Sequence, residues 1–177
     1  MKKSTSLFAS VLALCAVAVT SCGSNDTWED YAEWRTANAE WLKAQEATGL
    51  YTRVVPEWNS NLYVLMRWLN DTTLTSGNLT PKYTSQVSVK YYGTLYDGTA
   101  FDSTYTATDS VVSINLDECI YGWAIAMERC HAGDEVEVLI PYEAGYGEDE
   151  TGSIKPYSVL RFNMTLTDIP YYEIKPE

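Results

Sequence analysis

Aromatic side chains and a few polar groups carry most of the chemistry that this sequence offers. Residues 91–103 read Tyr-Tyr-Gly-Thr-Leu-Tyr-Asp-Gly-Thr-Ala-Phe-Asp-Ser, and a Gly-Trp pair at residues 122–123 and a Tyr-Gly pair at residues 146–147 follow. Rings of this kind can line a dry pocket for an apolar group, while hydroxyl and backbone N–H donors bind carbonyl oxygens beside it. Such a pocket acts by binding and orienting its ligand.

The sequence has little equipment for covalent or metal-assisted catalysis. His131 is the only histidine, and neither a Gly-x-Ser-x-Gly motif nor a phosphate-binding glycine-rich loop occurs. A Ser-His-Asp or Cys-His site needs partners that this histidine does not have. His131, Cys130 and Cys119 would make a poor metal site, because no acidic residues stand at suitable spacing. We therefore expect neither a metal nor a cofactor.

The aromatic motifs resemble those of the FKBP-type peptidyl-prolyl isomerases. That family's pattern is Tyr-x-Gly-x-Leu-x-Asp-Gly-x-x-Phe-Asp-Ser, then Ile-x-Gly-Trp, then Tyr-Gly, and this chain has these identities in the same order. The resemblance covers about residues 62–170. It implies catalysis of X-Pro isomerisation, whose barrier is the partial double bond of the peptide, about 18–20 kcal/mol. An enzyme lowers this barrier by favouring the twisted amide over both planar forms.

The resemblance also assigns roles to individual residues. It places Trp123 at the pocket floor, Tyr91, Phe101 and Phe162 as aromatic walls, and Ile120 beside them. Tyr146 would donate its hydroxyl to a ligand carbonyl, and the backbone N–H of Ile120 would be the second donor. Asp102 is expected as a buried carboxylate near the rim, held by hydrogen bonds. We predict these seven residues as the catalytic set.

Three further residues are predicted to contact the substrate, and some of them depart from the family pattern. Val112 stands where the family commonly has another aromatic wall, Cys119 replaces an apolar neighbour, and Ile154 matches an apolar contact of the flap. In that flap, residues 148–157, Lys155 interrupts the usual Ile-Pro-Pro, and three acidic residues open the segment. These departures leave turnover and the preferred residue before proline open.

The first residues resemble a bacterial lipoprotein signal. Two lysines precede an apolar run, residues 7–19, that is too short to span a bilayer, and Val-Thr-Ser-Cys follows at residues 19–22. We expect cleavage after residue 21 and acylation of Cys22, which would anchor the protein to a bacterial membrane of the cell envelope, favouring the outer membrane, with the body facing the periplasm or the exterior. The alternative is an ordinary secretory signal with a chance cysteine.

The charge of the chain argues against nucleic acid as a partner. The sequence has 12 basic and 24 acidic residues, a formal charge of −12, and loss of residues 1–21 removes two lysines and no acids, giving −14. Binding to a phosphate backbone depends on a basic footprint, which is missing.

Two cysteines remain in the expected mature body, Cys119 and Cys130. An envelope location permits a disulfide between them. Buried thiols also behave as small hydrophobic groups, and we favour free, buried cysteines over a bridge.

Residues 22–49 are predicted to form a tether and an amphipathic helix. The helix spans about residues 27–48, with Asp26 or Thr27 as its cap and Gly49 at its end. Its aromatic stripe comprises Trp28, Tyr31, Trp34, Trp41 and Leu42. This face is expected to dock on the protein's own sheet; the alternatives are self-association through the helix and binding of a partner.

Residues 50–177 are predicted to form one α+β domain, a twisted antiparallel β-sheet wrapped around one short helix. Apolar and polar residues alternate in several segments, including residues 87–92, 135–140 and 160–166, which indicates strands with one buried face. Asp97-Gly98 predicts a hairpin turn. Residues 120–129 are predicted as the short helix, closed by Gly133.

These expectations combine into one function. We expect a prolyl isomerase that acts on exported polypeptides and assists their folding in the cell envelope. The competing hypothesis is a non-catalytic peptide-binding chaperone, or an assembly module, that uses the same groove.

Overall fold

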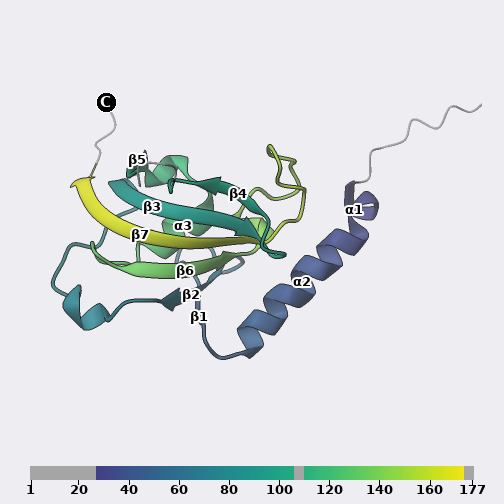
Figure 1. The fold of residues 1–177 in the computed structure, drawn as a ribbon, viewed down its shortest axis with the longest axis horizontal. Helices are drawn as coiled ribbons and strands as arrows, with labels where there is room; N and C mark the ends of the chain where they lie inside the picture. The colour runs from purple at the N-terminus through teal and green to yellow at the C-terminus, as the bar shows by residue number, and fades with distance from the viewer. Residues whose placement is uncertain (1–26, 106–109, 174–177) are drawn as a thin grey trace, which may run out of the picture.

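A computed structural model of the chain, which describes residues 27–105 and 110–173, shows a twisted antiparallel sheet wrapped over a short helix (Figure 1). The strands are β1 (Thr52–Val54), β2 (Val64–Trp68), β3 (Gln86–Leu95), β4 (Ala100–Ser103), β5 (Val112–Asn115), β6 (Glu135–Ile140) and β7 (Leu160–Tyr171). Their order is β1-β2-β6-β7-β3-β4, and β5 pairs with β3. The predicted α+β class, with a helix before the sheet, is confirmed. The predicted signal peptide and Cys22 lie outside the described residues.

The helices differ from the predicted ones mainly at their ends. They are α1 (Thr27–Asp30), α2 (Ala32–Ala47) and α3 (Tyr121–Met127), and η1 (Thr72–Leu74), η2 (Leu116–Glu118) and η3 (Tyr142–Ala144) are short 3-10 turns. The predicted N-terminal helix is interrupted at Tyr31 and ends before Gly49, whose φ of +71° suits a glycine after a helix. Gly133 does not close α3. It lies in the turn before β6, where its N–H donates to the carbonyl of Leu166 in β7. None of the helices in the described ranges is long and apolar enough to cross a bilayer.

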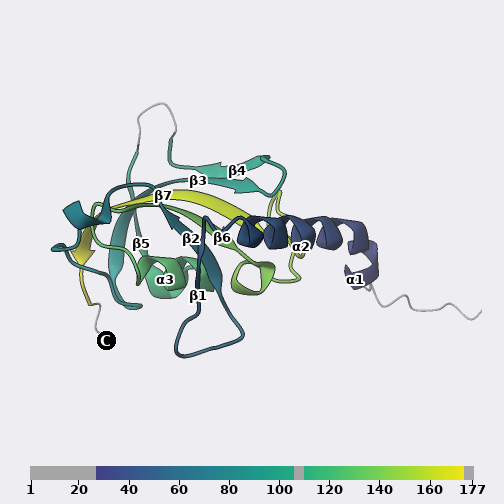
Figure 2. The same cartoon turned by 90° about the horizontal axis from the view of Figure 1, so that it is seen from below.

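The core lies between α3 and the inner face of the sheet (Figure 2). Alternate residues of β6 and β7 point inward, and the antiparallel register places Val138 opposite Phe162. The turn at Asp97-Gly98 forms as predicted: the N–H of Gly98 donates to the carbonyl of Leu95, and Gly98 has a φ of +89°. The hairpin of β3 and β4 is therefore defined by local sequence.

The outer face of the sheet is also partly covered, which the alternation of β6 did not predict. Leu65, Leu139 and Val159 pack against Leu42 of α2 in a second buried cluster. Glu137, expected on a solvent face, is fully buried there, where its carboxylate accepts hydrogen bonds from Arg67 and Arg161. The alternation indicated one buried face, whereas α2, which was expected to dock on the sheet, covers part of the other face.

The aromatic stripe of α1 and α2 docks within the protein as favoured from the sequence, but its rings contact a hairpin turn and a loop, and only Leu42 packs on the sheet. Trp34 and Trp41 contact Tyr96 in the turn after β3, with ring centroids 5.1 and 6.4 Å apart. Trp28 packs edge-on against Tyr157, at 5.5 Å. With Leu42 in the second cluster, four of the five stripe residues therefore have intramolecular contacts.

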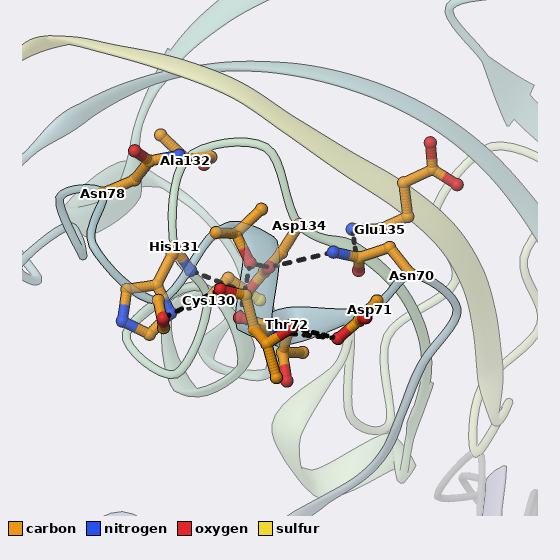
Figure 3. Close-up of polar contacts among 12 residues, drawn as sticks. Asn70, Asp71, Thr72, Asn78, Cys130, His131, Ala132, Asp134 and Glu135 are labelled. Atoms are coloured by element: carbon orange, nitrogen blue, oxygen red, sulfur yellow. Dashed lines mark hydrogen bonds and ion pairs between the residues drawn. The ribbon is translucent and has the colours of Figure 1, made fainter.

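A polar network around Asp134 connects the loop after β2 with the turn before β6 (Figure 3). The buried Asp134 carboxylate accepts hydrogen bonds from the hydroxyl of Thr75, from the side-chain amide of Asn70 at 3.3 Å, and from the backbone N–H of His131 at 2.8 Å. Asn70 in turn accepts a bond from the N–H of Glu135 at 2.9 Å. Burial alone would raise the pKa of Asp134, but the hydrogen bonds outweigh it and lower that pKa below its ordinary value.

Candidate active site

A cavity of about 440 Å³ opens on the inner side of the β3–β4 hairpin. Nine of the ten residues predicted for the pocket line it: Tyr91, Phe101, Asp102, Cys119, Ile120, Trp123, Tyr146, Ile154 and Phe162. They come from β3, β4, β7, the start of α3 and the loop between β6 and β7. Segments that are distant in sequence therefore meet at one place.

Four aromatic rings form one wall and the floor of the cavity. Phe162 packs edge-on against Trp123 and Phe101, with centroid distances of 5.3 and 5.4 Å and interplanar angles of 87°. Tyr91 packs against Trp123 at 5.0 Å and 83°. Edge-to-face pairs of this geometry are favourable and limit ring motion. The four rings present a rigid apolar surface to a ligand.

Two glycines allow this packing, although the sequence assigned them no role beyond their place in the motifs. A Cβ atom on Gly93 would lie 2.7 Å from Cζ of Phe101 and 2.9 Å from Cε1 of Phe162. A Cβ atom on Gly122 would overlap the side chain of Ile140. The first glycine lets the rings reach β3, and the second lets α3 approach the sheet.

The Asp102 carboxylate is held by hydrogen bonds, but it is exposed and not buried as predicted. It accepts a bond from the hydroxyl of Tyr91 at 2.5 Å and from the N–H of Ser103 at 2.8 Å. Its strand, β4, lies at the edge of the sheet, so one side of the carboxylate meets solvent. Burial, and then the hydrogen bond and charge of Asp102, raise the pKa of Tyr91 far above its ordinary value.

Two hydrogen-bond donors at the rim of the cavity are unpaired. Neither the hydroxyl of Tyr146 nor the backbone N–H of Ile120 finds an acceptor among the described residues. Burial, with smaller contributions from Asp102 and Cys119, raises the pKa of Tyr146, so its hydroxyl stays protonated at neutral pH. Both groups are available to a ligand's carbonyl oxygens.

Residues 148–157 form the predicted flap beside these donors. Thr151 and Ile154 exchange backbone hydrogen bonds of 3.0 and 2.9 Å around Gly152, which has a φ of +59°. The N–H of Tyr157 donates to the carbonyl of Gly147 at 2.9 Å and closes the base of the flap. Thr151, Gly152, Ser153 and Ile154 all line the cavity.

Val112 is the one predicted pocket residue that does not line the cavity. It pairs with Val89 and packs half-buried against the core, while Ile114, two residues further along β5, lines the cavity instead. The register of β5 against β3 decides which of these two same-face residues reaches the pocket, and alternation alone cannot do so. Glu118, beside Cys119, is a second lining residue that the sequence reading missed.

Cys119 and Cys130 are both free, as favoured from the sequence, and Cys130 is fully buried. Cys119 is only half-buried, and its thiol donates to the carbonyl of Asn115 at 3.3 Å. Burial, with the charges of Glu118 and Asp117, raises the pKa of Cys119 to about 11, so this thiol is not a nucleophile at neutral pH. The described part of the chain holds no group of three or more His, Cys, Asp or Glu residues placed to bind a metal.

Comparisons with known proteins all match one family. The family model described as FKBP-type peptidyl-prolyl cis-trans isomerase matches residues 77–167. The chain is 37% identical over 100 residues to FkpA of Escherichia coli K12, a match covering 55% of this chain and 37% of that protein. It is 39% identical over 90 residues to the FKBP-type 22 kDa peptidyl-prolyl cis-trans isomerase of the same organism, covering 50% of this chain and 43% of the other.

The fold is also similar to a solved structure. The crystal structure of FkpA from Escherichia coli superposes with a TM-score of 0.69 and 24% identity, and covers 82% of this chain and 63% of that one. The sheet and short helix thus have the FKBP-like arrangement that the motifs implied. The sequence matches span less than half the length of the two curated relatives.

Proposed function

The chain belongs to the FKBP-type peptidyl-prolyl cis-trans isomerase family, and from this we propose that it catalyses cis/trans isomerisation of X-Pro bonds in exported polypeptides. Its partners are then proline-containing polypeptides that pass through the cell envelope. The reaction assists their folding, because uncatalysed isomerisation takes tens to hundreds of seconds.

One observation carries the proposal: a rigid aromatic cavity and two unpaired donors lie together. The proline ring binds against Trp123, Phe162 and the neighbouring rings, where the amide carbonyl loses part of its solvation. Loss of solvation favours the twisted amide, which has less charge separation than the planar forms. The Tyr146 hydroxyl and the Ile120 N–H bind carbonyl oxygens of the flanking backbone. No covalent step is needed.

The same proposal includes a lipid anchor. Acylation of Cys22, after removal of residues 1–21, attaches the domain to a membrane of the cell envelope, with the outer membrane favoured. The motif at residues 19–22 supports this, as does the strongly acidic body, which anionic lipids would otherwise repel. Mass spectrometry of the mature N-terminus tests it: an unmodified Cys22 would overturn the anchor.

A second candidate function is a chaperone that binds peptides without turnover. Two features favour it. The approach to the flap, Glu148 to Glu150, is acidic, and the cavity is lined by the aliphatic Ile114 on the side where an aromatic wall was expected at Val112. Measurements of the isomerisation rate and of peptide binding distinguish the two functions.

The test uses the chain from residue 23 onward, which keeps every described residue, and proline tetrapeptides that differ in the residue before proline. We expect acceleration of isomerisation and a loss of about fivefold to tenfold in kcat/KM for Tyr146→Phe, the value of one hydrogen bond. Tyr171→Phe is the matched control, because Tyr171 is exposed at the C-terminal end of β7, outside the cavity lining, and its kcat/KM should equal that of the parent. Binding of peptides without acceleration would establish the chaperone instead.

A further inference from the structure

Helix α2 lies against residues 155–159, which end the flap and lead into β7. Residues 151–154 line the cavity, and residues 155–159 follow at once and enter β7. Figure 1 shows α2 running beside this end of the sheet, and Figure 2 shows the same proximity from below. The helix precedes residues 77–167, the part that matches the family model.

A continuous set of hydrogen bonds connects the helix to the base of the flap. Asn38, 1% exposed, accepts a bond from the N–H of Val159 at 2.8 Å and donates its amide to the carbonyl of Trp34 at 2.8 Å. The indole N–H of Trp34 donates to the hydroxyl of Ser158 at 3.1 Å. That hydroxyl donates to the carbonyl of Lys155 at 2.7 Å. The base of the flap is thus bound to α2 at two points, the backbone N–H of Val159 and the side-chain hydroxyl of Ser158.

Ring contacts stabilise the same segment. The ammonium of Lys155 lies 4.7 Å from the ring centroid of Trp34, and Trp28 packs edge-on against Tyr157. Tyr157 has a φ of +61°, a conformation that costs a non-glycine residue free energy and that persists only where surrounding contacts impose it. Its ring is buried between α1 and Tyr142, so the helical segment contributes to this conformation.

The helix also contacts the hairpin that carries the opposite wall of the cavity. Trp34 and Trp41 pack on Tyr96, in the turn that joins β3 to β4. β4 carries Phe101 and Asp102 into the cavity. One tryptophan therefore touches the base of the flap and the hairpin that faces it.

We propose that Asn38 and Trp34 are positioning residues for the isomerase site: α2 holds the flap over the cavity by binding residues 155–159. This rests on the proposed function, and neither residue touches the substrate. Release of the flap would lower the affinity for peptides through Ile154 and Tyr146. The aromatic floor would remain intact, because its rings pack on one another.

The first test is kinetic and uses the chain from residue 23 onward. Trp34→Phe keeps a ring on Tyr96 but removes the donor to Ser158, and Asn38→Ala leaves the Val159 N–H unpaired. We expect both to raise KM for a proline tetrapeptide about threefold to tenfold, the effect of one lost hydrogen bond, with kcat changed less than twofold. Glu40→Ala, exposed on the same helix, is the control and should leave KM unchanged. Unchanged KM in both variants would overturn the proposal.

Hydrogen exchange supplies a readout that does not depend on activity. The N–H groups of Thr151 and Ile154 bond across the flap, and both should exchange faster in Trp34→Phe and Asn38→Ala, while amides between β6 and β7 stay as protected as in the parent. Equal flap exchange in parent and variants would overturn the positioning role even in an inactive protein. If the protein were not an isomerase but α2 still positioned the flap, the variants would still exchange their flap amides faster than the parent. Should Asn38→Ala not fold, Trp34→Phe decides both measurements.

Discussion

The cavity and the network around Asp134 differ in how their polar groups are hydrogen-bonded. In the network, the Thr75 hydroxyl, the Asn70 amide and the His131 N–H all point at one buried carboxylate. At the cavity, the Tyr146 hydroxyl and the Ile120 N–H have no acceptor among the described residues. Tyr146 is partly exposed and Ile120 is half-buried, so both donors can reach a ligand that enters the apolar cavity.

This difference separates stability from function within one domain. Groups that are fully paired stabilise the fold and have nothing left for a ligand. Groups left unpaired contribute little to stability and are available for binding. A substitution in the Asp134 network should therefore lower the free energy of unfolding, and a substitution at the rim of the cavity should alter the site. A substitution that disturbs the packing of the aromatic rings should affect both stability and activity.

The largest effect is expected at the network. Asp134→Ala removes the acceptor of three hydrogen bonds and leaves their donors unpaired, which should lower the free energy of unfolding by about 3 kcal/mol. Urea unfolding at neutral pH measures it, with Glu57→Ala, an exposed carboxylate, as the control. Because the pKa of Asp134 is lowered, its contribution is present at neutral pH and is lost as the pH falls through that lowered pKa. A loss below 1 kcal/mol, with the parent's acid dependence retained, would contradict the role given to this carboxylate.

A change where the rings meet should affect both quantities. In Gly93→Ala the new methyl group would displace Phe101 and Phe162, and overpacking of this kind costs about 2 kcal/mol of stability. We expect kcat/KM to fall more than tenfold in protein that is still folded, since the rings form the cavity wall. Gly77→Ala is the matched control, because no atom lies within 4 Å of its added Cβ and its backbone is not left-handed. Equal activity of the two variants would show that ring placement is not required.

The smallest effect is expected at the exposed rim. Asp102→Asn keeps an acceptor for the Tyr91 hydroxyl but removes the charge that contributes to the raised pKa values of Tyr91 and Tyr146. The Tyr146 pKa should therefore fall towards 10 while remaining above it, because burial is the larger cause. A pH titration followed by NMR measures the shift. The free energy of unfolding should change by less than about 0.5 kcal/mol, as for most exposed sites. A Tyr146 pKa that stays where it was would exclude Asp102 as a contributor.

Much of the site was predictable from sequence because it depends on local patterns. The order of Tyr91, Phe101, Trp123, Tyr146 and Phe162 identified the lining, and the alternation in β6 and β7 identified the inner face. The Asp-Gly turn and Gly49 formed as predicted, since each depends on the conformational freedom of one glycine.

Only the tertiary structure decided features that depend on what a residue meets from a distant part of the chain. Alternation placed Glu137 on the outer face, but Arg67 and Arg161 on neighbouring strands bury it. The motif named Asp102, and the edge position of β4 exposed it. Strand register brought Ile114 to the cavity in place of Val112.

The same distinction holds for α2. Its aromatic stripe predicted a face that must be covered, without saying by what. The structure covers it with Tyr96 and with residues 157–159, where the flap ends, so a helix outside the family motifs comes to lie beside the site. Local sequence determines periodicity and turns through backbone geometry, whereas burial and contact between distant segments depend on the free energy of packing the whole chain.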